Sequence, residues 1–323
     1  MSDYQFSFLY SILNGFEPNP AYYSCKNSSF IISVPQPFLG SYFLISGLIL
    51  ITLYFICAVA IAKSELMRTP AYKIMLVLAI YDIASLFINS IATGIFGFYG
   101  TTFCAHKMLF FTVGALALWS WLGSCITCIT LAINRCCDLN SQLKLWVIFN
   151  GNRIYWFITI FILYGFYGFL FSKPIIFHSQ YMSWFFDPLI GTDPSLYANY
   201  LQATNNLIVS LSTILLYLYI CVIIVRKSRI GSSSFTKTQK QIILQSILIC
   251  SCHTVATFIY VYMQFFSSPA ILIIIAQIGW QFCNSSLCIV YLTVNKTIRT
   301  SVIRMFWPGF VHRQTSVSHI STI

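Results

Sequence analysis

The chain has 323 residues, of which 58% are hydrophobic and 8% are charged, and its net charge is +11. Soluble domains carry about 25% charged residues, so this composition excludes an ordinary soluble fold and indicates a protein that crosses a membrane several times. The positive charge does not indicate nucleic-acid binding, because the Lys and Arg residues lie between apolar runs and form no basic face.

Seven long runs with few or no charged residues follow one another along the chain. A membrane-spanning helix needs about 20 mainly apolar residues, a length that each run approaches or exceeds. We expect an all-α fold, with an N-terminal tail over residues 1–37, a seven-transmembrane helix bundle over residues 38–295 and a tail over residues 296–323. The predicted spans cover residues 38–62, 74–99, 108–134, 154–172, 200–225, 241–266 and 270–294.

The last two spans lie in one charge-free stretch, residues 241–295, which is too long for a single helix across a bilayer. Pro ends a helix, and Ser competes for backbone hydrogen bonds. Ser267-Ser268-Pro269 is therefore the expected break between the sixth and seventh spans.

The basic residues predict how the bundle is oriented, because cytoplasmic loops carry an excess of Lys and Arg. With the N-terminus outside, only Lys26, Lys107 and Lys173 of the 18 Lys and Arg residues face outward, and the other fifteen face the cytoplasm. We therefore expect an external N-terminus, a cytoplasmic C-terminus and an external loop over residues 173–198.

Two cysteines and a sequon predict a disulfide and a glycosylation site that involve the N-terminal tail. Of 12 cysteines, only Cys25 and Cys104 fall in the expected external, oxidising compartment. Two cysteines allow one pairing, so we predict a Cys25–Cys104 disulfide, with two free thiols as the alternative. Asn27, in Asn27-Ser28-Ser29, is the predicted glycosylation site.

The spans contain no recognisable catalytic or metal site. Asp82 is the only acidic residue within them, so a pair of aspartates that share a proton is excluded. Ser124 and His253 lack flanking oxyanion glycines, and Cys125-x-x-Cys128 has no further ligand for zinc. A buried ionisable group in a membrane nevertheless points to a function. We expect a binding protein without a cofactor, and not an enzyme.

Short motifs resemble those of the rhodopsin-like G-protein-coupled receptors. Leu78-Ala79-Ile80-Tyr81-Asp82 matches that superfamily's Leu-Ala-x-x-Asp motif, and Asn134-Arg135-Cys136 stands where its Asp-Arg-Tyr motif would be. Tyr291 followed by Ile298-Arg299 resembles its last span and a short amphipathic eighth helix. The resemblance implies signalling roles for Asp82, Ser124, Asn134, Arg135 and Tyr291. Alternatively, Arg135 is an ordinary positive residue at the cytoplasmic end of a span.

The chain also departs from that superfamily. Leu287-Cys288 replaces an Asn-Pro pair, and the sixth span lacks the Cys-Trp-x-Pro motif. Asn134 replaces a carboxylate, which leaves Arg135 without an adjacent ionic partner. We therefore expect weaker restraint of the resting state and higher basal activity than in receptors with the acidic neighbour.

A set of segments from the second span to the tail carries a narrower resemblance, which covers most of the chain. The segments are Tyr72-Lys-Ile-Met75, Leu131-Ala-Ile-Asn-Arg-Cys136, Tyr181-Met-Ser-Trp-Phe-Phe-Asp-Pro188, Ile259-Tyr-Val-Tyr-Met-Gln264, Trp280-Gln281 and Asn295-Lys-Thr-Ile-Arg299. They resemble the nematode serpentine receptor class T family. This resemblance implies a plasma-membrane chemoreceptor of neurons, including their sensory cilia, that would bind small molecules and couple to a heterotrimeric G protein.

A ligand pocket would lie between the outer halves of the spans, where an apolar, aromatic cavity with a few polar groups suits a small molecule. No carboxylate lies in the outer half of any span, so a desolvated cation would lack its countercharge, and we expect a neutral ligand. The candidate lining residues are Asn89, Thr93, Trp119, Asn205, Asn206, Tyr260, Tyr262, Gln264, Gln277, Trp280 and Gln281.

Two alternatives to a signalling receptor remain open from the sequence. One is a transporter or channel subunit, although transporters usually show repeated halves and paired ionisable groups, which this chain lacks. The other is a degenerate receptor that folds without signalling, because its Asn-Arg-Cys and last-span motifs are altered. In each case the partners include membrane lipids and exclude nucleic acid.

Overall fold

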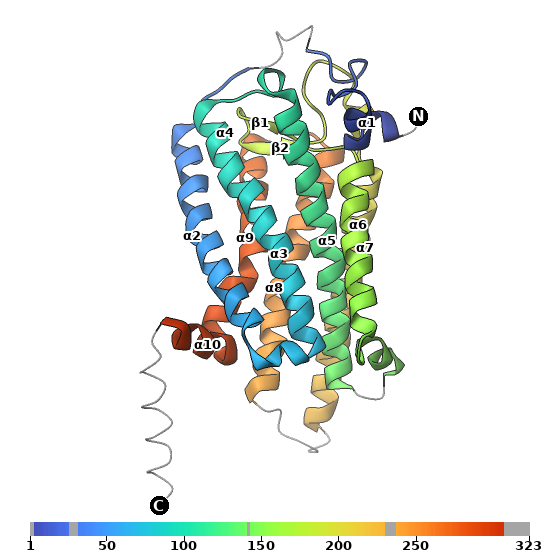
Figure 1. The fold of residues 1–323 in the computed structure, drawn as a ribbon, viewed down its shortest axis with the longest axis vertical. Helices are drawn as coiled ribbons and strands as arrows, with labels where there is room; N and C mark the ends of the chain where they lie inside the picture. The colour runs from blue at the N-terminus through green and yellow to red at the C-terminus, as the bar shows by residue number, and fades with distance from the viewer. Residues whose placement is uncertain (1–2, 26–31, 141–142, 230–236, 307–323) are drawn as a thin grey trace, which may run out of the picture.

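The computed structural model describes residues 3–25, 32–140, 143–229 and 237–306, and most of these residues are helical (Figure 1). Two short strands, β1 (Ile176–His178) and β2 (Ser183–Phe185), form an antiparallel hairpin in which Phe177 is paired with Trp184. The α-helices are α1 (Phe8–Leu13), α2 (Pro37–Ala62), α3 (Pro70–Leu86), α4 (Thr93–Tyr99), α5 (Lys107–Leu139), α6 (Arg153–Phe171), α7 (Tyr200–Arg229), α8 (Lys237–Phe265), α9 (Ala270–Thr293) and α10 (Lys296–Phe306).

Among the described residues, six helices are long and apolar enough to cross a membrane, so the protein is a multi-pass membrane protein. In lipid, each backbone N–H and C=O must be bonded within the protein, and a helix achieves this within one segment. The 29-residue α8 packs between α7 and α9 in the same bundle. The six are α2, the continuous α3–α4 segment Pro70–Tyr99, α5, α6, α9 and residues Tyr200–Ile223 of α7.

Helix α5 lies at the centre of the bundle and packs against α3, α6 and α7. In α5, α3–α4 and α9, 67% of the most apolar stretch is buried inside the protein, against 22–28% in α2, α6 and α7. Helices α5, α3–α4 and α9 carry buried polar residues such as Asp82, Ser124 and Gln277. Peripheral α2, α6 and α7 instead expose aliphatic and aromatic side chains on their outer faces, which suits contact with lipid.

The two ends of the bundle differ (Figure 1). The N-terminal segment, α1 and the β1–β2 hairpin cover one end, which we call the hairpin end. Helix α10 packs against α2 and α9 at the opposite end, which we call the α10 end. The mainly aromatic core around Phe110 and Phe177 lies toward the hairpin end. A second apolar core, around Leu78 and Leu287, lies toward the α10 end.

The second membrane helix is continuous from Pro70 to Tyr99 but contains a π-helical stretch, Phe87–Ala92, between α3 and α4. The wider turn changes which carbonyl oxygens are available. Thr93 donates a side-chain hydrogen bond to the carbonyl of Ile88 at 3.1 Å. The carbonyl of Asn89 accepts a bond from α9.

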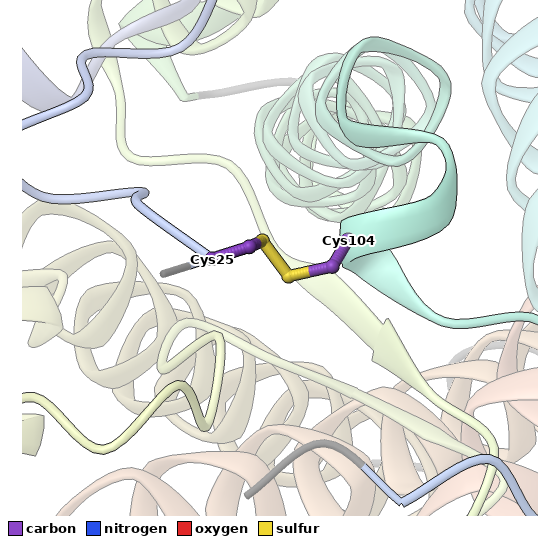
Figure 2. Close-up of a disulfide and its surroundings, with 2 residues drawn as sticks. All are labelled: Cys25 and Cys104. Atoms are coloured by element: carbon purple, nitrogen blue, oxygen red, sulfur yellow. A yellow bond between two sulfur atoms is a disulfide. The ribbon is translucent and has the colours of Figure 1, made fainter. Parts of the chain in front are cut away.

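A disulfide joins Cys25 to Cys104, the pairing expected from the sequence, with 5.9 Å between their Cα atoms (Figure 2). It fastens the N-terminal segment just before the start of α5. Phe8 of this segment packs on Phe169 of α6, with ring centroids 4.8 Å apart. Asn27, the predicted glycosylation site, lies outside the described residues.

Helix α5 continues five residues beyond the charge-free run that predicted it and ends at Leu139. Asp138, which lies beyond the predicted span 108–134, therefore belongs to the helix. A run without charges marks only the part of a helix that lies inside hydrocarbon. The helix itself can continue into water.

Candidate functional site

An aromatic cavity of about 530 Å³ opens at the hairpin end, between α5, α7, α8, α9 and the loop that contains the hairpin. Its wall combines rings, aliphatic side chains and a few polar groups, as small-molecule sites do. The lining residues are Ala117, Leu118, Trp121, Ile175, Tyr181, Trp184, Phe185, Phe186, Asp187, Leu189, Pro194, Tyr197, Ala198, Gln202, Tyr260, Met263, Gln264, Phe265, Phe266, Ser267, Ser268, Ile273 and Trp280.

Three of the candidates named from the sequence line this cavity: Tyr260, Gln264 and Trp280. Tyr260 packs edge-on against Trp280, with ring centroids 5.9 Å apart, so α8 and α9 together form one aromatic wall. Trp121 of α5 meets Trp280 at 6.5 Å in a similar arrangement. The Trp280 indole N–H is buried and bonds no group in the described residues, which leaves a donor at the cavity wall.

Gln277 lies beside the cavity and connects four neighbours. Its side-chain oxygen accepts hydrogen bonds from Tyr260 and Ser183, each at 3.2 Å, and its nitrogen donates to the Asn89 carbonyl at 3.0 Å. The same nitrogen lies 3.3 Å from the Thr93 hydroxyl, which accepts a 2.8 Å bond from Trp184. Asn89, Thr93 and Gln277 thus position Tyr260 and Trp184, and are not themselves among the lining residues.

The amides of α7 lie deeper in the bundle. Asn206 accepts a 2.8 Å hydrogen bond from the indole of Trp121, and Asn205 accepts a 2.9 Å bond from Tyr164. The bond from its indole N–H to Asn206 holds the Trp121 ring in place. Trp119, two residues earlier on α5, packs against rings of α3 and α6 and points away from the cavity.

Two other candidates also lie away from the cavity. Gln281 donates to the hydroxyls of Ser46 and Ser90 at 2.9 Å each, and so joins α9 to α2 and to the π-helical stretch. Tyr262 is 46% exposed and stacks on Phe266 along the outer surface of α8.

The loop between α6 and α7 supplies much of the wall, and the site candidates drawn from the sequence include none of its residues. Tyr181, Trp184, Phe185 and Tyr197 all come from it. The aromatic density of residues 181–186 was a usable signal. Loops usually lie in water and are not expected to line a buried pocket, whereas here the β1–β2 hairpin folds inward and closes the bundle.

The wall of this loop also contains a carboxylate, Asp187. The Oδ1 atom accepts a 2.9 Å hydrogen bond from the backbone N–H of Leu189. Burial raises the pKa of Asp187 above its ordinary value, the Leu189 N–H opposes this, and the charge of Asp193 adds to it. The expectation of a neutral ligand was based on the absence of a carboxylate in the outer half of any span, whereas Asp187 brings a carboxylate to the cavity wall from a loop.

The N-terminal segment supports the cavity wall through Lys173. The ammonium group, which is almost fully buried, donates to the carbonyls of Leu196 and Ala198 at 3.0 Å each. It also pairs with Asp3 at 3.2 Å and lies over the ring of Phe6. The charge of Lys173 is thus satisfied within the protein, and it fixes residues 194–198 beside the cavity.

A second polar centre lies deeper in the bundle, around the buried Asp82. Tyr54 of α2 donates to its Oδ2 atom at 2.7 Å, and Ser124 of α5 donates to Oδ1 at 3.1 Å. Asp82 and Ser124 are two of the residues for which the superfamily resemblance implies a signalling role. Tyr54 was not foreseen, because hydropathy does not show which residues of α2 face inward.

Toward the α10 end, Arg135 is 9% exposed and pairs with Asp138 one helical turn further along α5, at 3.4 Å. The guanidinium also lies 3.6 Å from the sulfur of Met75 on α3. Asn134 leaves Arg135 without an acidic neighbour at the adjacent position, but Asp138 supplies an ionic partner from the next turn of the helix, which the sequence analysis did not predict. Asn134 and Tyr291 are buried with polar atoms that bond no group in the described residues.

The chain is similar to known receptors over most of its length. Residues 6–315 match the family described as serpentine type 7TM GPCR chemoreceptor Srt. The serpentine receptor class T-55 of Caenorhabditis elegans is 26% identical over 235 residues, which are 72% of this chain and 64% of that receptor. The matched part is thus slightly less than two-thirds of the relative's length.

Proposed function

Because the chain belongs to the serpentine type 7TM GPCR chemoreceptor Srt family, we propose that it binds a small molecule in the hairpin-end cavity and signals through a heterotrimeric G protein. The aromatic cavity of about 530 Å³ is the observation that supports this most directly. Ligand sites of about 300–1,000 Å³ bury most of a small molecule behind aromatic and aliphatic side chains.

The proposed receptor lies in the plasma membrane, including that of sensory cilia, with its hairpin end outside and its α10 end in the cytoplasm. The Cys25–Cys104 disulfide at the hairpin end supports this orientation, because disulfides persist in oxidising compartments. The Lys and Arg residues in α10 and in the chain segments that connect the spans at the α10 end also support it, because cytoplasmic loops carry an excess of basic residues. Helix α10 would then lie along the cytoplasmic surface of the membrane as a short amphipathic helix.

A short path along α5 relates the cavity to the polar centre. Trp121 lines the cavity, and Ser124 lies three residues later, on the same face of the helix. Ser124 donates to Asp82, whose helix also packs against α5 and α9. A ligand that moves Trp121 would therefore act one helical turn from the Asp82 cluster.

The proposed mechanism is a shift between two arrangements of the bundle. A ligand changes their populations only as far as it binds one of them more tightly. In the active arrangement, the α10 end opens and Arg135 leaves Asp138 and Met75 to meet the G protein. Candidate signalling residues are Asp82, Ser124, Asn134, Arg135 and Tyr291.

The experiment is a small-molecule screen of the full chain in cells that contain a promiscuous G protein and a calcium reporter. Replacing Trp280 by Ala should weaken the response to an agonist by at least tenfold, because it removes one wall of the cavity. Trp156→Ala, on the lipid-facing surface of α6, is the matched control and should respond normally.

A second pair of variants tests signalling apart from binding. Arg135→Gln should abolish the response with normal surface expression and normal agonist binding. Lys144→Gln removes a charge from an exposed residue at the same end and should have no effect. A normal response from Arg135→Gln would refute the coupling role.

A further inference from the structure

Among the described residues that line the cavity, Asp187 is the only charged one. This part of the wall contains no Lys or Arg that could neutralise it. Lys173, the nearby lysine of the same loop, is already paired with Asp3 and bonded to two carbonyls. The cavity therefore presents a negative charge without a protein countercharge among the described residues.

The geometry of Asp187 leaves one carboxylate oxygen available. Its Oδ1 atom accepts the bond from Leu189, a residue with φ of 50°, so this bond holds a tight turn and orients the side chain. In the described part of the chain, no donor bonds the Oδ2 atom. This oxygen is open to the cavity, where a cationic N–H or an ammonium group could bond it with a charge-assisted hydrogen bond.

The rest of the wall suits the same chemistry. Ten of the 23 lining residues are aromatic, and ring faces attract cations electrostatically. Tyr181 and Phe185 meet edge to face at 5.7 Å on the segment that leads to Asp187. The raised pKa of Asp187 is what a carboxylate shows when burial is not offset by a nearby positive charge.

From these observations we infer that the ligand is an organic cation, with an amine or quaternary ammonium group on an apolar or aromatic body, and that Asp187 is its countercharge. The inference rests on the proposed function, because the same cavity serves both. It replaces the neutral ligand that the sequence favours. The apolar body would contact Trp121, Tyr260 and Trp280, and the cationic group would lie toward the loop.

The test uses the purified full chain in lipid nanodiscs and a panel of arylalkyl amines, each matched with its neutral N-acetyl derivative. Binding is measured at pH 7 by calorimetry and by the shift in unfolding temperature. The amine of a pair should bind at least tenfold more tightly than its amide. Asp187→Asn should weaken amine binding by about 10- to 100-fold, the range for a charge-assisted hydrogen bond, and leave amide binding unchanged.

Two features make the variant informative. An Asn at 187 can still accept the Leu189 hydrogen bond, so the turn is kept while the charge is lost. Asp193→Asn is the matched control, because Asp193 lies on the same loop, is exposed and bonds Ser195. It should keep the full preference for amines.

Equal binding within the pairs, binding of no amine, or an unchanged preference in Asp187→Asn would overturn the inference. The cell reporter separates this failure from failure of the proposed function. Activation by neutral agonists with no response to any amine, or amines that activate the wild type and Asp187→Asn equally, would leave the receptor function intact and exclude the cation site. A chain that reaches the surface and responds to no compound of either charge would contradict the proposed function itself.

Discussion

Arg135 and Asp138 pair within one turn of α5, at 3.4 Å, with Arg135 almost buried and Asp138 half-exposed. An ion pair of this kind contributes about 0.2–1 kcal/mol, which is enough to shift a balanced two-state equilibrium by about 1.4- to 5-fold. The pair exists in the arrangement described here and would have to break if Arg135 is to meet a G protein.

The first prediction concerns basal signalling. Asp138→Asn should raise agonist-independent activity by up to about fivefold, because it removes the ionic partner of Arg135. The measurement is reporter output per receptor at the cell surface. Asn134→Asp is the comparison: with Asp138 in place, a second carboxylate should lower basal activity only slightly. Basal output that is unchanged in Asp138→Asn would show that the pair does not restrain the receptor.

The second prediction concerns the disulfide. Replacing Cys25 or Cys104 by Ser removes a disulfide between residues that are 79 positions apart in the sequence. Loss of a native disulfide lowers the free energy of unfolding by about 2–5 kcal/mol. Both single variants and the double variant should lower the unfolding temperature equally, because each removes the same bond. Thermal unfolding of the detergent-purified chain measures this. A double variant clearly less stable than either single one would show a separate role for one thiol.

The third prediction concerns the contact between α2 and α4. A Cβ atom on Gly94 would lie 2.8 Å from the Gly40 carbonyl and 2.8 Å from the Leu44 nitrogen, both backbone atoms that cannot rotate away. Gly94→Ala should therefore force the helices apart and destabilise the protein by about 1–3 kcal/mol.

Gly279 of α9 provides the matched control, because no atom of the described residues, apart from its two chain neighbours and the nearby backbone of its own helix, lies within 4 Å of the place that a Cβ would take there. Gly279→Ala should be neutral, or stabilise the helix by up to about 1 kcal/mol through its higher helix propensity. The measurement compares the unfolding temperatures of the two variants. Equal stability would mean that α2 and α4 are not in close contact.

The fourth prediction concerns pH. Burial lowers the pKa of His178 to about 4, and its Nε2–H donates to the Asp187 carbonyl. A solvent-exposed His has a pKa of about 6.5. A hairpin that opens and exposes His178 to water therefore binds a proton more readily than the closed hairpin, in which burial lowers the pKa of this side chain. Closure of the hairpin is therefore favoured above about pH 6.5 and is progressively lost as the pH falls from about 6.5 toward 4.

Amide hydrogen exchange of residues 176–185, corrected for its intrinsic pH dependence, measures this opening. Protection should decrease between about pH 7 and pH 5 in the wild type and change less in His178→Gln. The raised pKa of Asp187 acts in the opposite direction, since the closed form takes up that proton first. The difference between the two proteins isolates the contribution of His178. An equal loss of protection in both would exclude His178 as the cause.

The sequence predicts the long helices well, because hydrophobic length is set by bilayer thickness and Pro marks helix starts. Pro37, Pro70 and Pro269 each lie at or just before the first turn of a helix. The superfamily resemblance also named Asp82 and Ser124, which bond each other in the structure. These features depend on local composition, or on a fold shared with other receptors.

The rotation of each helix about its axis is harder to predict. In lipid, both faces of a helix can be apolar, so hydropathy gives little sign of which face turns inward. Tyr260 and Tyr262 are only two residues apart, yet one lines the cavity and the other is exposed on the outer surface. The cavity wall around Asp187 was missed for another reason, namely that a loop was expected to stay in water.

The π-helical stretch Phe87–Ala92 has a consequence for the residues that follow it. Its additional residue rotates α4 by about 100° relative to a regular helix continued from α3. That rotation turns Gly94 toward Gly40, and Thr93 toward Trp184. A single-residue deletion within 87–92 would thus restore a regular helix while turning both contacts away. The length of this stretch therefore determines which way the side chains of α4 point.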